Sequence, residues 1–457
     1  MTGLATAATL RAQVMTLRDC MAYAISNSTK MRIQQADVND ARIDRRNAIL
    51  AVFLPSINSG TSASYSFGRN IDPETNTYIN TVSFSNGYNL SASMTLFNGF
   101  SAVNNLKISQ TALKMGQTRE KQTEADLCLA VMEAYYNVLY YQQMAEAQER
   151  QAAVAERLLE KASREEALGL KSHSDVIQLE ADLADRRYDL VRSRNMLDDQ
   201  RVKLEDLLFW PVGEPLVIAE EMPDQVGHDA VPGVTSGSAL NLQTGNSVTP
   251  GWTGDPFPEE ALEAALAHNP AVQLAAWSVE NARLDLKTAR WQLLPTVSLG
   301  GGWSTSYYSF QGTQQVPYWD LLRRNGGEYV SLSVSIPIFN RLSRQSNIAR
   351  KRSALARAEA NYDQTQRDVA SEIRRAIQDC DGAAAAFEQA DRKAAVQEEA
   401  YAMHTRKLEE GLISPLEYQT AANNYLRAGT DRLNSLYQYL IKLAVVRYYN
   451  GIDYINQ

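Results

Sequence analysis

The sequence GLKSHSD, residues 169–175, recurs in related form 242 positions later as GLISPLE, residues 411–417. Each copy interrupts a long helical pattern, and glycine ends a helix readily because it adopts the left-handed conformation without steric cost. Ser172 and Ser414 then stand three residues before an acid, which is the spacing of a helix cap with a carboxylate in the first turn. Each copy therefore predicts a tight reversal between two helices, called a tip below.

The segments that flank the tips are also repeated. Leu54-Pro55 corresponds to Leu294-Pro295, and Phe97-Asn98-Gly99 corresponds to Phe339-Asn340 at the same offset of 242. Each half predicts a helix, two strands, a long helix, a tip and a returning helix. An ordinary turn is the alternative for a single tip, but the repeated flanks favour a tandem duplication.

The predicted organisation has five parts. They are a signal-peptide remnant at 1–14, a first repeat at 15–210, a linker or equatorial belt at 211–258, a second repeat at 259–451 and a tail at 452–457. A disordered tail is the alternative for the first part, which has no basic start. Within the repeats, 17–50 and 259–292 are each expected to form one helix.

The strands are predicted from an alternation of period two. The longest example alternates apolar with hydroxyl or amide residues over about fifteen positions, twice the usual strand length. Its apolar positions are Val82, Phe84, Tyr88, Leu90, Ala92, Met94 and Leu96. A shorter alternation begins at Ile57, and two more lie at 297–307 and 330–338, with a long loop expected between these last two.

The helices that precede the tips are predicted to be about 100 Å long, which indicates a coiled coil or a tunnel wall. Apolar and small residues recur at intervals of four and three along one face. The first such seam runs from Leu127 to Leu159, and the second, from Val369 to Leu408, has the same register. Cys380 and His404 lie on the second seam, so we expect them to be packed rather than reactive.

Composition excludes several classes of protein. The formal net charge of the 457 residues is −8, which disfavours a nucleic-acid partner. Three cysteines at unrelated spacings indicate neither a disulfide framework nor a metal site. No run approaches the ~18 apolar residues of a membrane-spanning helix. We find no phosphate loop, zinc-protease motif or nucleophile elbow, so we expect no enzyme, cofactor or metal.

Four long strands per chain raise a physical problem. Their apolar face suits lipid and their hydroxyl face suits water, yet an isolated sheet has open edges, which a bilayer does not tolerate. Four strands are also too few for a pore, because the smallest membrane barrels have about eight. Three chains supply twelve strands. We therefore predict an α+β channel-tunnel in which a trimeric β-barrel continues into a helical barrel.

These residues resemble the outer-membrane efflux protein (TolC) family. The resemblance covers Leu17 to Gly451 and rests on the duplicated order of elements, the Leu-Pro and Phe-Asn pairs and the two tips. It implies a homotrimeric conduit in the outer membrane of a Gram-negative bacterium, with its helical tunnel in the periplasm. It also implies docking to a periplasmic adaptor and an inner-membrane pump, in an efflux or type I secretion system.

The resemblance assigns roles to single residues. The residues that correspond to adaptor-docking tips are Gly169, Leu170, Lys171, Ser172, Gly411, Leu412, Ile413 and Ser414. Glu417 stands where the family has a carboxylate at the periplasmic constriction, and Asp175 and Gln178 form the matching pair in the first repeat. Thr420 replaces a second aspartate of the family, and Ile413 replaces a basic residue that helps to close the gate.

Two alternatives stay open at this point. Glu417 could only cap its helix, instead of forming a ring of mutually repelling carboxylates that opening relieves. The whole chain could be a periplasmic adaptor with helical hairpins, although an adaptor should have a single hairpin and no strands of membrane-barrel type. Trp303, Tyr307 and Tyr308 are candidates for an aromatic girdle at the membrane interface, with ordinary strand aromatics as the alternative.

Overall fold

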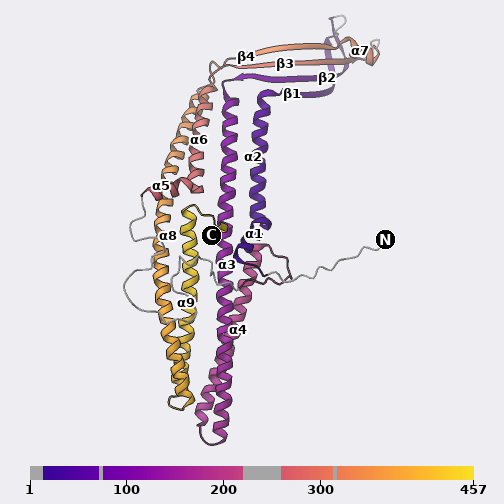
Figure 1. Ribbon diagram of the computed structural model, residues 1–457. Coiled ribbons are helices and arrows are strands. Elements are labelled where there is room, and N and C mark those ends of the chain that lie inside the picture. The colour runs from indigo at the N-terminus through magenta and orange to yellow at the C-terminus, as the bar shows by residue number, and fades with distance from the viewer. Residues whose placement is uncertain (1–13, 72–75, 220–258, 312–315, 457) are drawn as a thin grey trace, which may run out of the picture. The chain divides into compact units, whose positions relative to one another are not determined.

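The fold is given by a computed structural model that describes residues 14–71, 76–219, 259–311 and 316–456 (Figure 1). It forms two compact units. Unit 1 comprises residues 1–35, 118–273 and 364–457, and unit 2 comprises residues 36–117 and 274–363. The predicted signal-peptide remnant, except Val14, and most of the predicted linker lie outside the described residues. No helix in the described ranges is long and apolar enough to cross a bilayer.

The elements follow the predicted order twice along the chain. They are α1 (Leu17–Asn27), α2 (Thr29–Phe53), β1 (Ser56–Ile71), β2 (Tyr78–Asn98), α3 (Ser101–Ala167), α4 (His173–Leu208), α5 (Glu259–His268), α6 (Pro270–Trp291), β3 (Thr296–Phe310), α7 (Tyr318–Arg324), β4 (Gly327–Ser335), α8 (Ser343–Glu409), α9 (Pro415–Tyr449) and the 3-10 turn η1 (Tyr454–Asn456). The fold is mostly helical, with one four-stranded antiparallel sheet.

Three differences from the predicted elements have local causes. The predicted helix 17–50 is divided at Ser28, whose extended backbone ends α1 and whose hydroxyl accepts a bond from the Lys30 amide at 3.2 Å. The predicted helix 259–292 is divided at Asn269, whose side chain accepts from the Ala271 amide at 2.9 Å just after Pro270. Both residues are helix caps. The loop expected before Gly327 contains the short helix α7.

The sheet belongs to unit 2, and its strand order is β1-β2-β3-β4. Tyr65 pairs with Phe84 and Leu90 pairs with Trp303, while Leu299 pairs with Leu332. A bulge interrupts β2 between Thr95 and Phe97. Because the order follows the chain, β1 and β4 are both edge strands, and each has one neighbour among the described strands.

The pairing defines two faces of the sheet. Directly opposed residues of antiparallel strands point to the same side. The apolar face includes Ile57, Tyr65, Phe67, Phe84, Tyr88, Leu90, Ala92, Met94, Leu299, Trp303, Tyr307, Val330, Leu332 and Val334. Most of these large side chains are exposed in the single chain, Leu332 for example at 65%. The sheet thus has a hydrophobic side that is mostly exposed.

The opposite face of the sheet is rich in hydroxyl groups and has no charged residue on any of the four strands. Its serines bond across strands, as between Ser56 and Ser93 at 2.9 Å and between Ser64 and Ser85 at 2.8 Å. Tyr308 pairs with Ser85 on this face, whereas Tyr307 lies on the apolar face. Tyr308 therefore cannot share an outward-facing girdle with Trp303 and Tyr307.

The Phe-Asn pairs join the strands to the long helices by the same device in both repeats. The side chain of Asn98 accepts a bond from the Ala102 amide at 3.1 Å, and that of Asn340 accepts from the Arg344 amide at 3.4 Å. Between cap and helix, two residues in each repeat have positive φ. They are Gly99 and Phe100 at 64° and 60°, and Arg341 and Leu342 at 58° and 61°.

Unit 1 is a set of helices with a core of buried apolar and aromatic side chains. Val131 and Val138 of the first predicted seam are fully buried, and Val369 and Ile373 of the second are also buried. Tyr135 lies in the same core and donates to the Ala219 carbonyl at 2.9 Å. The packing of both seams confirms the coiled-coil pattern read from the sequence.

We predict that Gly99→Ala destabilises the protein by about 3 kcal/mol or more, because a left-handed alanine is strained and its side chain meets backbone. A Cβ at Gly99 would lie 2.2 Å from the Trp291 carbonyl oxygen. Arg341→Ala is the matched control, since it occupies the equivalent left-handed position without glycine and should cost within about 0.5 kcal/mol. Thermal unfolding followed by circular dichroism measures both, and equal midpoints would contradict the prediction.

Candidate functional site

The first tip connects α3 to α4 through a Schellman-type turn. Gly169 has φ 72°, and its amide donates to the Glu166 carbonyl at 2.8 Å. The Leu170 amide donates to the Glu165 carbonyl at 2.8 Å. Ser172 then caps α4 by accepting from the Asp175 amide at 3.2 Å. Leu170 is 76% exposed, so the tip presents an apolar side chain to solvent.

The second tip connects α8 to α9 with the same bonds, each displaced by 242 residues. The amides of Gly411 and Leu412 donate to the Leu408 and Lys407 carbonyls at 3.0 and 2.8 Å. Ser414 caps α9 by accepting from the Glu417 amide at 3.3 Å. The predicted helix–glycine–helix reversal is therefore present in both repeats, down to the individual bonds.

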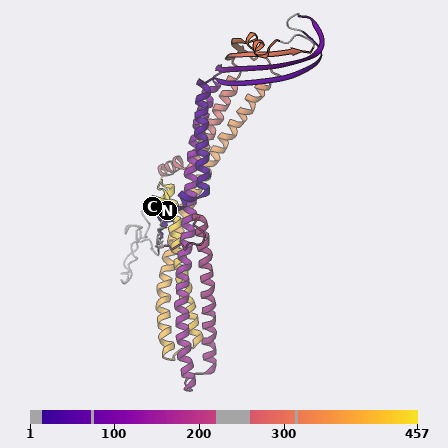
Figure 2. The ribbon, with the colours of Figure 1, turned by 90° about the vertical axis from the view of Figure 1, so that its right-hand side faces the viewer.

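The two tips lie at the same end of unit 1 (Figure 2). The Gln419 side chain donates to the Gln178 carbonyl at 3.3 Å, and Lys161 donates to the Glu409 carbonyl at 3.1 Å. These bonds link the α3–α4 hairpin to the α8–α9 hairpin. The structure thus brings the residues predicted for the two tips to one place.

The predicted constriction residues lie in the first two turns of the returning helices, Asp175 and Glu417 in the first turn and Gln178 and Thr420 in the second. Glu417, Thr420 and Gln178 are exposed, and Asp175 is half-buried. The Thr420 hydroxyl donates to the Leu416 carbonyl at 2.9 Å, so it is partly engaged by its own helix. Within the described residues, no hydrogen bond or ion pair links Asp175 to Glu417. Ile413 is partly buried and packs against the cluster of Leu408, Tyr418 and Ala422.

A buried polar layer above the tips was not anticipated from the sequence. Tyr418 is 2% exposed, and its hydroxyl lies 3.0 Å from that of Tyr401, which donates to Gln151 at 3.3 Å. Burial, together with the hydrogen bond to Tyr401, raises the pKa of Tyr418. The layer joins α3, α8 and α9 through the buried Gln151 and Tyr418 and the half-buried Tyr401.

Helix α4 contains a buried ion pair. Arg186 lies 3.2 Å from Asp182, with side chains only 5% and 7% exposed. Burial raises the pKa of the Asp182 carboxyl, although the neighbouring guanidinium opposes the shift. The sequence signal was present as an acid and a base four residues apart on α4. That signal could not reveal that this pair, among many similar ones, faces inward.

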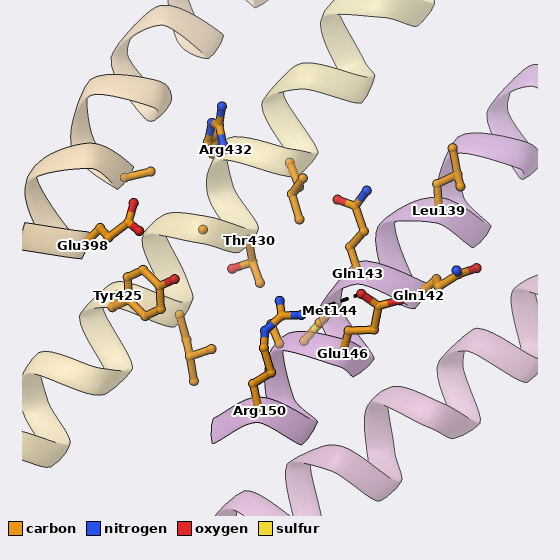
Figure 3. Close-up of a pocket in the computed structure, with 15 residues that line it drawn as sticks. Leu139, Gln142, Gln143, Met144, Glu146, Arg150, Glu398, Tyr425, Thr430 and Arg432 are labelled. Atoms are coloured by element: carbon orange, nitrogen blue, oxygen red, sulfur yellow. Dashed lines mark ion pairs between the residues drawn. The ribbon is translucent and has the colours of Figure 1, made fainter. Parts of the chain in front are cut away.

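An open pocket of about 360 Å³ lies between α3, α8 and α9 (Figure 3). Figure 3 shows that apolar, polar and charged side chains line it, and the ion pair between Glu146 and Arg150, at 3.8 Å, lies on its α3 side. Glu398 and Tyr425 face it from α8 and α9. In the described part of the chain, no group of His, Cys, Asp and Glu is placed to hold a metal ion.

The three thiols are buried and free. Burial raises the pKa of Cys20 and Cys128 to about 12 and that of Cys380 to about 11. His404 is half-buried, and its Nδ1 lies 2.8 Å from the Ala400 carbonyl oxygen. These residues contribute packing and local bonds.

Comparison with known proteins identifies the class. The profile of the outer membrane efflux protein family matches residues 22–208 and again residues 261–451. The two matches cover most of the chain and coincide with the two repeats. The chain therefore belongs to the outer membrane efflux protein family, and it is an outer-membrane efflux channel. This is a family of conduits and not of enzymes.

Solved structures share the fold across nearly the whole chain. CusC matches with a TM-score of 0.72 and 17% identity, covering 95% of this chain and 91% of that one. VceC of Vibrio cholerae matches with a TM-score of 0.69 and 15% identity, covering 95% and 96%. The MtrE outer membrane channel of Neisseria gonorrhoeae matches with a TM-score of 0.71 and 15% identity, covering 95% and 88%. The comparison with curated proteins found no match.

We predict that Arg186→Met lowers the free energy of unfolding by about 3–5 kcal/mol, because it leaves the Asp182 carboxylate buried without a cation. The double change Asp182→Asn with Arg186→Met should recover most of that loss, since it removes both charges. Chemical unfolding of the purified protein measures the cycle. Additive effects of the two single changes would show that the two groups do not interact.

Proposed function

We propose that the chain is one third of a channel-tunnel in which three copies close a twelve-stranded β-barrel. The observation that carries this proposal is the sheet itself, which among the described strands has two edges without a strand neighbour and an apolar face that is mostly exposed in the single chain. Joining β1 of one copy to β4 of the next satisfies both edges. The barrel then has no unpaired backbone within the lipid.

The two faces of the sheet suit the two sides of such a barrel. The apolar face meets lipid, and the hydroxyl face lines the pore. Because the strands contribute no charge to that lining, the barrel itself exerts little selectivity between cations and anions. Charge selection then falls to the other end of the conduit, where Asp175 and Glu417 stand.

The helices extend into the periplasm, and the tips dock a periplasmic adaptor. The tip residues Gly169, Leu170, Lys171 and Ser172, with Gly411, Leu412, Ile413 and Ser414, offer exposed apolar side chains, with Leu412 68% exposed. The conduit is passive, so an inner-membrane pump supplies the energy in a tripartite efflux or type I secretion system. An adaptor role for this chain is disfavoured by its two helical hairpins and its four long strands.

The central test is the mass and the conductance of the detergent-purified protein. We expect three chains per particle and ion-conducting channels in planar bilayers. Monomers without conductance would contradict the proposal.

Two neighbouring positions on β4 sharpen this test. Leu332→Arg places a charge on the lipid face at a cost of about 2–4 kcal/mol per chain, so less trimer should reach the membrane. Ser333→Arg places the same charge on the opposite face, so trimers should form and the pore should shift toward anion selectivity. Equal trimer yields for the two variants would contradict the assignment of the faces.

Glu417 is tested at the constriction. Glu417→Ala removes a ring of three carboxylates, so we expect divalent cations to block the trimer at least about fivefold more weakly. Glu359→Ala, an exposed carboxylate far from the tip on α8, is the control and should leave block unchanged. If Glu417→Ala leaves both block and conductance unaltered, Glu417 serves its helix alone.

A further inference from the structure

The short helix α7 is held on the apolar face of the sheet. The Tyr318 hydroxyl donates to Asn86 at 2.7 Å and lies 2.8 Å from the Tyr88 hydroxyl. Its ring also packs against Tyr307 at 4.7 Å between centroids. Asn86, Tyr88 and Tyr307 all lie on the face that carries the exposed apolar residues. The helix therefore covers part of the side that the proposed function assigns to lipid.

Further bonds fix the orientation of α7. The Thr305 hydroxyl donates to the Leu322 carbonyl at 2.5 Å, and the Asn325 side chain donates to the Ser306 carbonyl at 2.7 Å. Leu321 is the buried side chain of α7. With its inner side fixed in this way, α7 presents Trp319, Arg323 and Arg324 to the surroundings, and Trp319 is 72% exposed.

The height of α7 on the sheet matches the boundary of a bilayer. β4 has nine residues and begins three positions after α7 ends. Nine residues rise about 30 Å along a strand, and a tilt of about 40° reduces this to about 23 Å, close to the ~25 Å apolar band of a membrane barrel. In unit 2, α7 lies at the end of the sheet away from α2 and α6 (Figure 1). It therefore stands at the outer rim of the band.

The charge of α7 indicates what it binds there. Arg323 and Arg324 occupy its last turn, are exposed and form no ion pair within the described residues, although Asp320 and Glu328 are near in the chain. A guanidinium binds phosphate by paired, charge-assisted bonds. Tryptophan and tyrosine favour the interface between headgroups and acyl chains. The combination fits a phosphorylated lipid of the outer leaflet.

We propose that α7 is a docking surface for a phosphorylated outer-leaflet lipid, with Arg323 and Arg324 on its phosphate and Trp319 at the acyl boundary. The inference rests on the proposed orientation of the sheet, with its apolar face toward lipid. It adds a specific lipid contact to a face that is mostly apolar and also carries Arg69 and Glu328.

The test uses the purified full-length protein in detergent micelles, with diphosphoryl lipid A as the probe and native mass spectrometry as the readout. We expect Arg323→Gln with Arg324→Gln to weaken lipid A binding at least about tenfold. The lysine pair at the same positions keeps the charge and should stay within about threefold of the wild type. Arg374→Gln with Arg375→Gln is the matched control, since it removes two adjacent exposed arginines from α8 and should leave lipid A binding unchanged.

The outcomes separate this inference from the proposed function. If the glutamine pair trimerises and conducts but binds lipid A as tightly as the wild type, the lipid site is overturned while the channel stands. If inorganic phosphate displaces lipid A completely at a concentration equal to that of the lipid A headgroups, the site recognises phosphate alone and the lipid assignment is overturned. If the wild-type protein forms neither trimers nor conducting channels, the proposed function itself is contradicted.

Discussion

The hydrogen-bonding groups at the two edges of the sheet are the constraint on which this molecule depends. Among the described strands, β1 and β4 each have a strand neighbour on one side only, while most of the apolar face of the sheet is exposed. In lipid, unpaired backbone groups cost several kcal/mol each, so a sheet of this length requires closure. Pairing with identical copies is the simplest closure, because the first and last strands of every chain are the free ones.

Duplication is expressed in bonds as well as in sequence. Both long helices begin with an asparagine cap followed by two residues of positive φ, and both end in the same glycine turn with the same two backbone bonds. The copies differ where their surroundings differ. Gly99 faces the Trp291 carbonyl and admits no side chain, whereas the equivalent Arg341 has room for one. The two repeats thus share the same left-handed backbone at this position, although the space around it differs between them.

The hairpins of unit 1 combine an apolar core with a polar layer just above the tips. Leu408, Tyr418 and Ala422 form an apolar cluster against which the half-buried Tyr401 packs, with its hydroxyl 3.0 Å from that of Tyr418, and the buried Asp182–Arg186 pair lies on the neighbouring helix α4. Displacing a buried polar or charged group costs more free energy than displacing an apolar one, because its partner is then left without a hydrogen bond or a counter-charge. The layer therefore fixes the register of the two hairpins near the predicted docking surface.

The sequence by itself determined the elements whose signals are local: the period-two strands, the two helical seams and the glycine tips, where neighbouring residues set the backbone. It also predicted the four-stranded sheet and the repeat. The helix breaks at Ser28 and Asn269 depend on side-chain caps, which the helical pattern of apolar residues does not reveal. Only the tertiary structure decided the strand register, the face on which Tyr308 lies, the inward orientation of the Asp182–Arg186 pair and the packing of α7 on Tyr88. Each of these depends on contacts between side chains and surfaces that are set by packing, often across hundreds of residues, and no local pattern encodes them.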